Sequence, residues 1–120
     1  SVDLYGQICA ESAGTRQISG TGGQMDFLEG AYRSKGGKGF ICINSSRVTK
    51  DGERKSNILA TIPGGSTISA PRTMIQYVAT EYGIASLSGK TLRERAEAMA
   101  SIAHPDFREE LMKYARENFK

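Results

Sequence analysis

The feature that most constrains this chain is a cluster of glycines placed directly before a helical segment. Three of the four residues from 20 to 23 are glycine, and glycine's wide backbone freedom disfavours regular structure there. Residues 24–33 then carry apolar side chains at helical spacing. These are Met25, Phe27, Leu28, Ala31 and Tyr32. We therefore predict a loop that leads into the N-terminus of a helix.

This junction has an evident chemical use. Backbone amides at a glycine turn before a helix point outward, and the helix dipole strengthens their attraction for an anion. A phosphate or the oxyanion of a thioester would be stabilised there, and losing one donor to a developing charge costs about 3 kcal/mol. The alternative is a tight turn in which the glycines only permit positive φ and close packing. Asp26, in the first helical turn, either orients the loop or contacts a ligand.

The rest of the chain reads as strands followed by helices. Residues 2–10 alternate apolar and polar, which predicts a strand with one buried face. The isoleucine-rich run 40–44 indicates a strand buried on both faces of a covered, parallel sheet. Further β-branched segments lie at 58–62 and 75–79, and the polar residues 47–56 predict an exposed hairpin or loop.

Two helices are predicted at the end of the chain. Thr91 and Glu94 have the spacing of a capping box, so a helix should begin at Leu92. His104-Pro105 should end this helix and open another. The predicted class is therefore α/β, with an open, mostly parallel sheet and covering helices.

Length and charge narrow the possible partners. The chain has 120 residues, about one domain, and a net charge of +3 from 16 basic and 13 acidic residues. No basic run or long apolar run is present, so we expect neither a nucleic-acid partner nor a membrane span. Cys9 and Cys42 lie in apolar settings without nearby ligands, which predicts buried, reduced thiols, no metal site and a cytoplasmic location. The strand-like start, without methionine, indicates a processed or truncated product.

Three other motifs are weaker candidates for chemistry. Met25 stands where a dinucleotide fingerprint needs its third glycine, which argues against a Rossmann site. Residues 83–91 resemble a phosphate loop, but five residues separate the glycines where the motif has four, and Thr91 already serves as a cap. His104 lacks a nucleophile partner, so a cap or packing role is predicted. Phe40 and Tyr82 either stack on an adenine ring or, more commonly, pack in the core.

Two longer blocks resemble a known family. The first is residues 19–31 (SGTGGQMDFLEGA), followed by Ser34 and Gly36-Gly37-Lys38. The second comprises residues 80–85 (TEYGIA), Gly89-Lys90, Glu94-Arg95-Ala96 and residues 102–108 (IAHPDFR). Both are similar to signatures of the acetyl-CoA hydrolase and 4-hydroxybutyrate coenzyme A transferase family. The order and separation of the blocks make the resemblance specific over nearly the whole chain.

The resemblance implies a CoA-transferase-like fold of two related open α/β domains, with residues 1–120 as the C-terminal portion of the second, incomplete as a domain. It implies transfer of CoA from an acyl-CoA to a small carboxylate through a glutamyl-CoA thioester, with no permanent cofactor. The glutamate would lie in a missing N-terminal segment or a complementary chain, and Glu11 does not match its motif. The complete enzyme is expected to be a homo-oligomer.

The resemblance also assigns site residues. Gly23 is expected to donate its backbone amide to the thioester oxyanion, and Gly22 to shape the turn. The expected CoA and substrate contacts are Ser19, Gly20, Gln24, Asp26 and Lys38. Arg72-Thr73-Met74 and Ser88 depart from the family pattern and leave surface or substrate contacts open. An acyl-CoA hydrolase, a non-catalytic CoA-binding or interaction module, and a nucleotide-binding domain using Gly89-Lys90-Thr91 remain alternatives.

Overall fold

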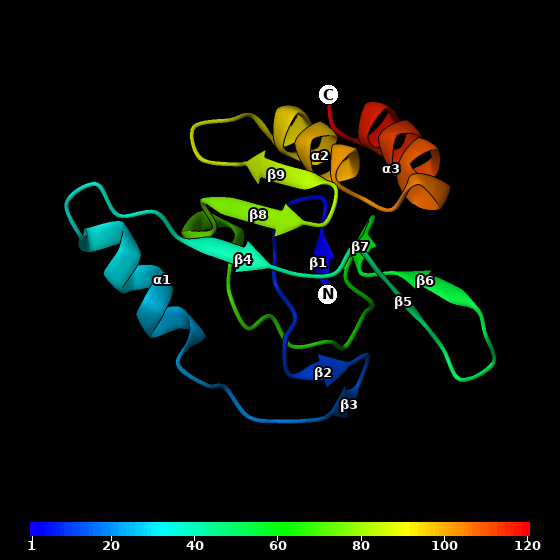
Figure 1. The fold of residues 1–120 in the computed structure, drawn as a ribbon, viewed down its shortest axis with the longest axis horizontal. Helices are drawn as coiled ribbons and strands as arrows, with labels where there is room; N and C mark the ends of the chain where they lie inside the picture. The colour runs from blue at the N-terminus through cyan, green and yellow to red at the C-terminus, as the bar shows by residue number, and fades with distance from the viewer.

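The structure, a computed structural model, describes residues 1–120 (Figure 1). Its helices are α1 (Gln24–Arg33), α2 (Leu92–Ser101) and α3 (Pro105–Asn118), with a 3-10 turn η1 (Arg72–Met74). Its strands are β1 (Val2–Asp3), β2 (Ser12–Ala13), β3 (Arg16–Gln17), β4 (Phe40–Cys42), β5 (Ser46–Val48), β6 (Arg54–Ser56), β7 (Ile58–Leu59), β8 (Tyr77–Thr80) and β9 (Gly83–Ser86). The α/β class predicted from the sequence is confirmed.

The strands form several small sheets of mixed direction. The largest has the order β4-β8-β9, with β4 parallel to β8 and β8 antiparallel to β9. The pair β1-β7 is parallel, whereas β2-β3 and β5-β6 are antiparallel hairpins. The parallel part is therefore smaller than the sequence suggests, and the hairpin predicted within residues 47–56 is present as β5-β6.

The core lies between this sheet and the two C-terminal helices. Figure 1 shows α2 and α3 side by side next to β9. Small side chains at Ala96, Ala100 and Ala103 are fully buried, which lets α2 lie close to its neighbours. Larger fully buried side chains, such as Leu87 and Met99, fill the space between, each stabilising the fold by about 1.5–3 kcal/mol.

Local capping fixes where these helices begin. The Thr91 hydroxyl accepts from the Glu94 amide at 3.3 Å, and the Glu94 carboxylate accepts from the Thr91 amide at 2.8 Å. This confirms the predicted capping box. At α3, His104 Nδ1 accepts from the Asp106 amide at 3.2 Å and Pro105 occupies the first turn, so the predicted cap is confirmed as well.

The prediction of one strand over residues 2–10 is wrong. After β1 the chain reverses, because Gly6 adopts φ +89° and the Asp3 carboxylate accepts from both the amide and the side chain of Gln7. Ile8 then returns to bridge Val2 and Ala70. A side chain at position 6 would meet the Arg95 guanidinium at 2.8 Å, so this close approach requires glycine.

The strand predicted at 40–44 is shorter and more exposed than expected. Phe40 is 45% exposed and Cys42 is also exposed, which contradicts burial on both faces and a buried Cys42 thiol. The reason is that β4 is the edge strand of its sheet, beside β8, and no helix of this chain packs closely over its faces. Cys9, in contrast, is buried as predicted.

Candidate functional site

The predicted glycine loop leads directly into α1. Gly23 is the N-cap of the helix and supplies no side-chain cap, and the first helical hydrogen bond runs from the Phe27 amide to the Gly23 carbonyl at 3.1 Å. The backbone amides of residues 20–26 donate to no acceptor within the chain. These donors stand free at the positive end of the helix dipole.

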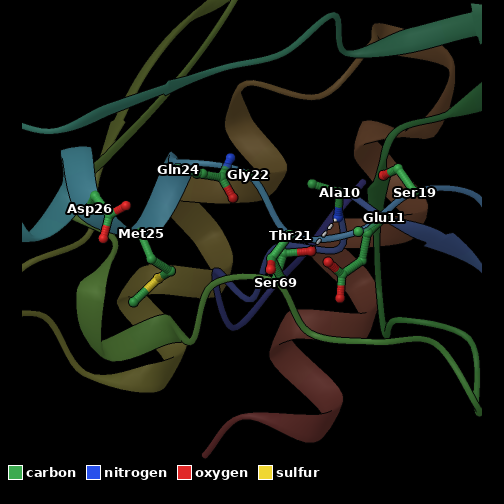
Figure 2. A pocket seen from close by; sticks show the side chains of 10 residues that line it. Ala10, Glu11, Ser19, Thr21, Gly22, Gln24, Met25, Asp26 and Ser69 are labelled. Carbon is green, nitrogen blue, oxygen red and sulfur yellow. Dashed lines mark hydrogen bonds between the residues drawn. The ribbon is translucent and has the colours of Figure 1, made fainter.

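A cavity of about 570 Å³ lies against this loop (Figure 2). Its lining residues are Ala10, Glu11, Ser19, Gly20, Thr21, Gly22, Gln24, Met25, Asp26 and Ser69. Of the residues expected at the site, Ser19, Gly20, Gly22, Gln24 and Asp26 line it together. Figure 2 shows Asp26 and Met25 toward one end and Glu11 and Ser19 toward the other.

Two expected site residues do not line this cavity. Gly23 lies between the lining residues Gly22 and Gln24 without lining the cavity itself. It has φ −81° and ψ 10°, and a Cβ added there would touch the Phe27 ring at 3.6 Å. Lys38 lines a second, more apolar cavity of about 380 Å³ beside α1 and β4, together with Phe27 and Phe40. Gln24 lines both cavities and so connects them.

The wall opposite the glycine loop comes from distant segments. The Glu11 carbonyl accepts from the amides of Ile18 and Ser19 at 2.8 and 3.1 Å, which fixes the start of the loop. Ser69 accepts from the Ala10 amide at 2.9 Å. No sequence pattern pointed to Ser69, because its approach to the loop depends on the return of the chain at Ile8.

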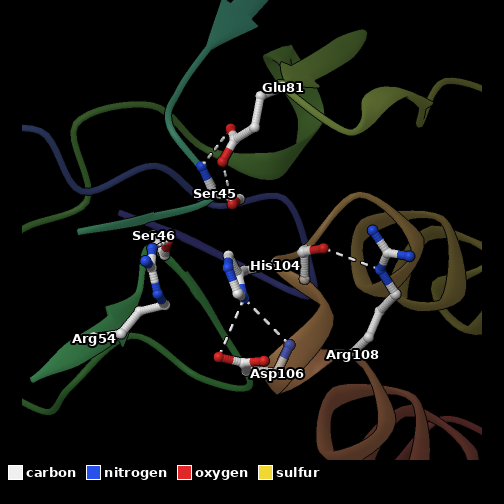
Figure 3. A network of polar contacts seen from close by, with 8 residues as sticks. Ser45, Ser46, Arg54, Glu81, His104, Asp106 and Arg108 are labelled. Carbon is white, nitrogen blue, oxygen red and sulfur yellow. Dashed lines mark hydrogen bonds and ion pairs between the residues drawn. The ribbon is translucent and has the colours of Figure 1, made fainter. Parts of the chain in front are cut away.

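A second polar cluster clamps the β8-β9 hairpin to the segment after β4 (Figure 3). Buried Ser45 donates its hydroxyl to the Glu81 carboxylate at 2.5 Å and its amide at 2.9 Å. The Ser45 hydroxyl, followed by the Ser45 amide, holds the pKa of Glu81 below its ordinary value. The exposed Asp106 carboxylate lies 3.7 Å from His104 Nδ1. The Ser45–Glu81 pair joins the hairpin to the segment after β4, and Glu81 also lines a cavity of about 440 Å³ together with Cys42 and Thr80.

The aromatic residues considered for adenine stacking lie apart from the loop cavity. Phe40 stacks on Tyr77 with ring centroids 4.8 Å apart, and the Arg108 guanidinium lies 5.1 Å from the Tyr82 ring centre. Both Phe40 and Tyr82 remain nearly half exposed, so full core packing is not observed for either. No three His, Cys, Asp or Glu side chains come close enough to hold a metal ion together. None of the helices has both the length and the apolar character needed to cross a bilayer.

Comparison with known proteins gives a consistent result. The family described as acetyl-CoA hydrolase/transferase C-terminal domain matches residues 1–115. The chain is 55% identical over 115 residues to a probable butyrate:acetyl-CoA coenzyme A-transferase from Syntrophomonas wolfei, covering 96% of this chain and 26% of the relative. It is 50% identical over 118 residues to a 4-hydroxybutyrate coenzyme A transferase from Clostridium kluyveri, covering 98% of this chain and 27% of the relative.

Solved structures agree with these relatives. RipA from Yersinia pestis matches with a TM-score of 0.82 and 39% identity, covering 97% of this chain and 25% of RipA. A 4-hydroxybutyrate CoA-transferase from Porphyromonas gingivalis matches with a TM-score of 0.66 and 42% identity, covering 92% of this chain and 25% of that protein. The chain thus spans about a quarter of the length of the relatives it matches. It belongs to the acetyl-CoA hydrolase/transferase C-terminal domain family.

Proposed function

We propose that this chain supplies the oxyanion-binding part of a coenzyme A transferase active site. The observation that carries the proposal is the row of backbone amides at residues 20–26, which have no acceptor within the chain and border a cavity. In a member of this family, the group that would accept these hydrogen bonds is the oxygen of a thioester as it gains negative charge. The Gly23 amide is the proposed principal donor, and the adjacent Gly22 is proposed to leave room for the substrate, since no side chain projects there into the cavity that it lines.

The proposed reaction moves CoA between two carboxylates. A glutamate carboxylate attacks the acyl-CoA carbonyl carbon and releases CoA thiolate, which leaves a mixed anhydride. The thiolate then attacks the glutamyl carbonyl carbon, so the original acyl group leaves as a free carboxylate and a glutamyl-CoA thioester forms. The incoming carboxylate reverses these steps. Each attack places negative charge on a carbonyl oxygen, and a free backbone amide stabilises this charge by donating a hydrogen bond to it.

The glutamate in this scheme comes from a segment outside residues 1–120, either upstream in the same protein or in a complementary chain. Two observations support a covering segment: β4 has an unpaired edge, and Phe27 and Phe40, which line one cavity beside it, are 83% and 45% exposed. Exposed apolar side chains that lie together mark surfaces that bind another part of a protein. On this proposal, residues 1–120 are the C-terminal portion of the second transferase-like domain.

The proposal extends to ligands and assembly. Acyl-CoA and a small carboxylate are the substrates, no cofactor is held permanently, and Ser19, Gly20, Gln24 and Asp26 contact substrate in the loop cavity. Lys38 lines the neighbouring cavity, and we propose that its ammonium group contacts a CoA phosphate there. The complete protein is expected to be a cytoplasmic homo-oligomer.

Hydrolysis is the second candidate. The chain is 30% identical over 115 residues to an acetyl-CoA hydrolase from Kluyveromyces lactis, so related chains carry both names. The same amides would serve an attack by water, and exclusion of water by the whole active site would favour transfer. Release of free CoA from acetyl-CoA without an added carboxylate acceptor distinguishes hydrolysis from transfer.

The decisive experiment uses the complete protein incubated with acyl-CoA and analysed by intact-mass spectrometry. We expect a glutamyl-CoA adduct, and a lower turnover number in Gly23→Val, because this variant keeps the Gly23 amide but adds a side chain that would crowd an oxygen bound to it. Gly30→Ala is the matched control, because a Cβ at Gly30 meets open space on the same helix. An absent adduct together with normal turnover in Gly23→Val would refute the mechanism. Turnover by residues 1–120 alone would refute their dependence on another segment.

A further inference from the structure

The loop cavity contains buried acceptors as well as free donors. The Glu11 side chain lies in a residue only 9% exposed, and its Oε2 atom has no hydrogen-bond partner. Gln24 Oε1 is likewise buried without a partner. Among the buried side-chain atoms lacking a partner, only Thr49 Oγ1 lies elsewhere, since both other residues line the loop cavity. Buried polar atoms in folded proteins normally have partners.

No donor within the chain lies at hydrogen-bond distance from Glu11 Oε2. The Ser69 hydroxyl accepts from the Ala10 amide, and the Ser12 hydroxyl accepts from the Thr67 amide and hydroxyl at 2.9 and 3.1 Å. The Glu11 backbone carbonyl is already occupied by the amides that anchor the loop. Burying a carboxylate oxygen without a donor is costly. The unpaired oxygen therefore calls for a hydrogen-bond donor that arrives with a ligand.

The two walls of the cavity define what that ligand must carry. The amides of residues 20–26 favour an oxygen with negative charge, whereas Glu11 and Gln24 can accept from an N–H or O–H group. A bare phosphate or alkyl carboxylate would satisfy the amides, but it would leave Glu11 unpaired and would be repelled by its charge. A ligand that combines an oxyanion with a neutral hydrogen-bond donor satisfies both walls.

We propose that Glu11 positions substrate by accepting a hydrogen bond from a neutral N–H or O–H group, while the glycine-loop amides hold the reacting oxygen. The inference rests on the proposed function and deepens it. Two substrate sources supply such a donor: the amides of the pantetheine arm of CoA, and a hydroxyl group on the carboxylate. Glu11 is a binding and positioning residue in this proposal and forms no covalent bond.

The test compares ligands with and without the donor, using the complete protein and a Glu11→Met variant. For the thioester, acyl-N-acetylcysteamine carries one amide N–H and an acyl butanethiol ester carries none. For the acceptor, 4-hydroxybutyrate and butyrate differ by one hydroxyl. We expect Glu11→Met to lower kcat/KM about tenfold for the donor-bearing member of one pair and less than about threefold for the other member. The pair that responds identifies the source of the donor.

Several outcomes overturn the inference. Equal loss on both members of both pairs would mean that Glu11 does not bind the donor, and so would unchanged values. A loss of kcat beyond about a thousandfold would place Glu11 in the chemical steps instead. If Glu11→Met fails to fold, Glu11→Gln preserves the size of the side chain and should show the same selectivity with about a threefold change.

A binding measurement separates this inference from the proposed function. Calorimetric titration with CoA and with 3′-phospho-ADP, which lacks the pantetheine arm, needs no turnover. If the thioester pair responds, Glu11→Met should raise the dissociation constant of CoA about tenfold and leave that of 3′-phospho-ADP unchanged. If the acceptor pair responds, Glu11→Met should raise the dissociation constant of 4-hydroxybutyrate about tenfold and leave that of butyrate unchanged. If the titrations show this effect of Glu11→Met but the wild-type protein transfers no CoA, the proposed function is refuted and Glu11 is still a ligand-binding residue. If Glu11→Met weakens the ligands with and without the donor equally in both titrations, the Glu11 inference is refuted and the proposed function is unaffected.

Discussion

The region around α2 and α3 differs from the region around α1 in how much of each helix is buried. In α2, Ala96, Met99 and Ala100 are buried, whereas in α1 only Leu28 is buried. Figure 1 shows α2 and α3 packed together near β9, while α1 lies at the opposite side of the molecule. The comparison teaches that this chain buries most of its apolar side chains in one region and leaves backbone amides without internal acceptors in another.

Arg95 illustrates how the closed region is held together. Its guanidinium is nearly buried and donates to the carbonyls of Tyr5, Arg72 and Leu87 at distances of 2.8–3.0 Å. Burial, followed by the nearby charge of Arg72, lowers the pKa of Arg95. One side chain therefore joins the N-terminal turn, η1 and the end of β9.

The largest expected effect is at this residue. Arg95→Met should lower the free energy of unfolding by about 3 kcal/mol or more, because it leaves buried carbonyls without donors. Urea denaturation of residues 1–120 measures the loss. Arg93→Met, on the exposed side of the same helix, is the control and should stay within about 0.5 kcal/mol. Similar values for the two variants would mean that Arg95 does not hold the segments together.

A second pair compares apolar side chains in the two regions. Met99→Ala removes a fully buried side chain and should cost about 2–5 kcal/mol of unfolding free energy. Phe27→Ala removes a larger side chain that is 83% exposed and should change it by less than about 0.5 kcal/mol. Thermal or urea denaturation tests both. A large loss for Phe27→Ala in residues 1–120 would show that α1 is packed as firmly as α2.

A third pair tests the backbone of α1. Gly30→Ala should stabilise the helix by about 1 kcal/mol, because a Cβ there meets open space and alanine favours helices. Gly37→Ala should instead destabilise the end of α1, since its Cβ would overlap Ser34 Oγ and the Ala31 carbonyl. Hydrogen exchange of the α1 amides should slow about fivefold in the first variant and accelerate in the second. Equal exchange rates in the two variants would contradict the difference in free space around positions 30 and 37.

The smallest effect concerns acid stability. Because the pKa of Glu81 is lowered in the folded state by Ser45, its contribution is present above the ordinary value of 4.5 and is lost as the pH falls through the folded pKa. The stability difference between the wild-type chain and Ser45→Ala should therefore shrink as the pH falls below 4.5. Urea denaturation across this range measures it. Ser101→Ala is the control, because its hydroxyl donates to the Ala98 carbonyl, which does not titrate. A stability difference that stays constant with pH would show that the contribution of Ser45 does not depend on ionisation of Glu81.

Sequence patterns predicted well whatever depends on neighbours along the chain. The limits of α1 at residues 24–33 agree with the apolar spacing, and the capping box placed the start of α2. Ser19, Gln24 and Asp26 line one cavity because a loop and its following helical turn share a single surface. These features follow from spacing and hydrogen bonds within a few residues.

The remaining features depended on contacts between distant segments. The reversal after β1 and the exposure of Phe40 were missed because a short apolar run does not reveal which strand or helix covers it. Lys38, predicted to contact CoA or substrate, lines the neighbouring cavity, since the turn after α1 carries it past the helix. Glu11 and Ser69 meet only because the chain returns through Ile8 and Ala70.

The sequence by itself therefore determined the glycine loop, the helix it starts and the family, because these are written in the order and spacing of adjacent residues. Only the tertiary structure decided which amides stay free, which carboxylate is buried opposite them and which helix faces remain uncovered. The physical reason is that burial and hydrogen-bond partners are set by long-range packing, which removes water from some groups and leaves others exposed to it.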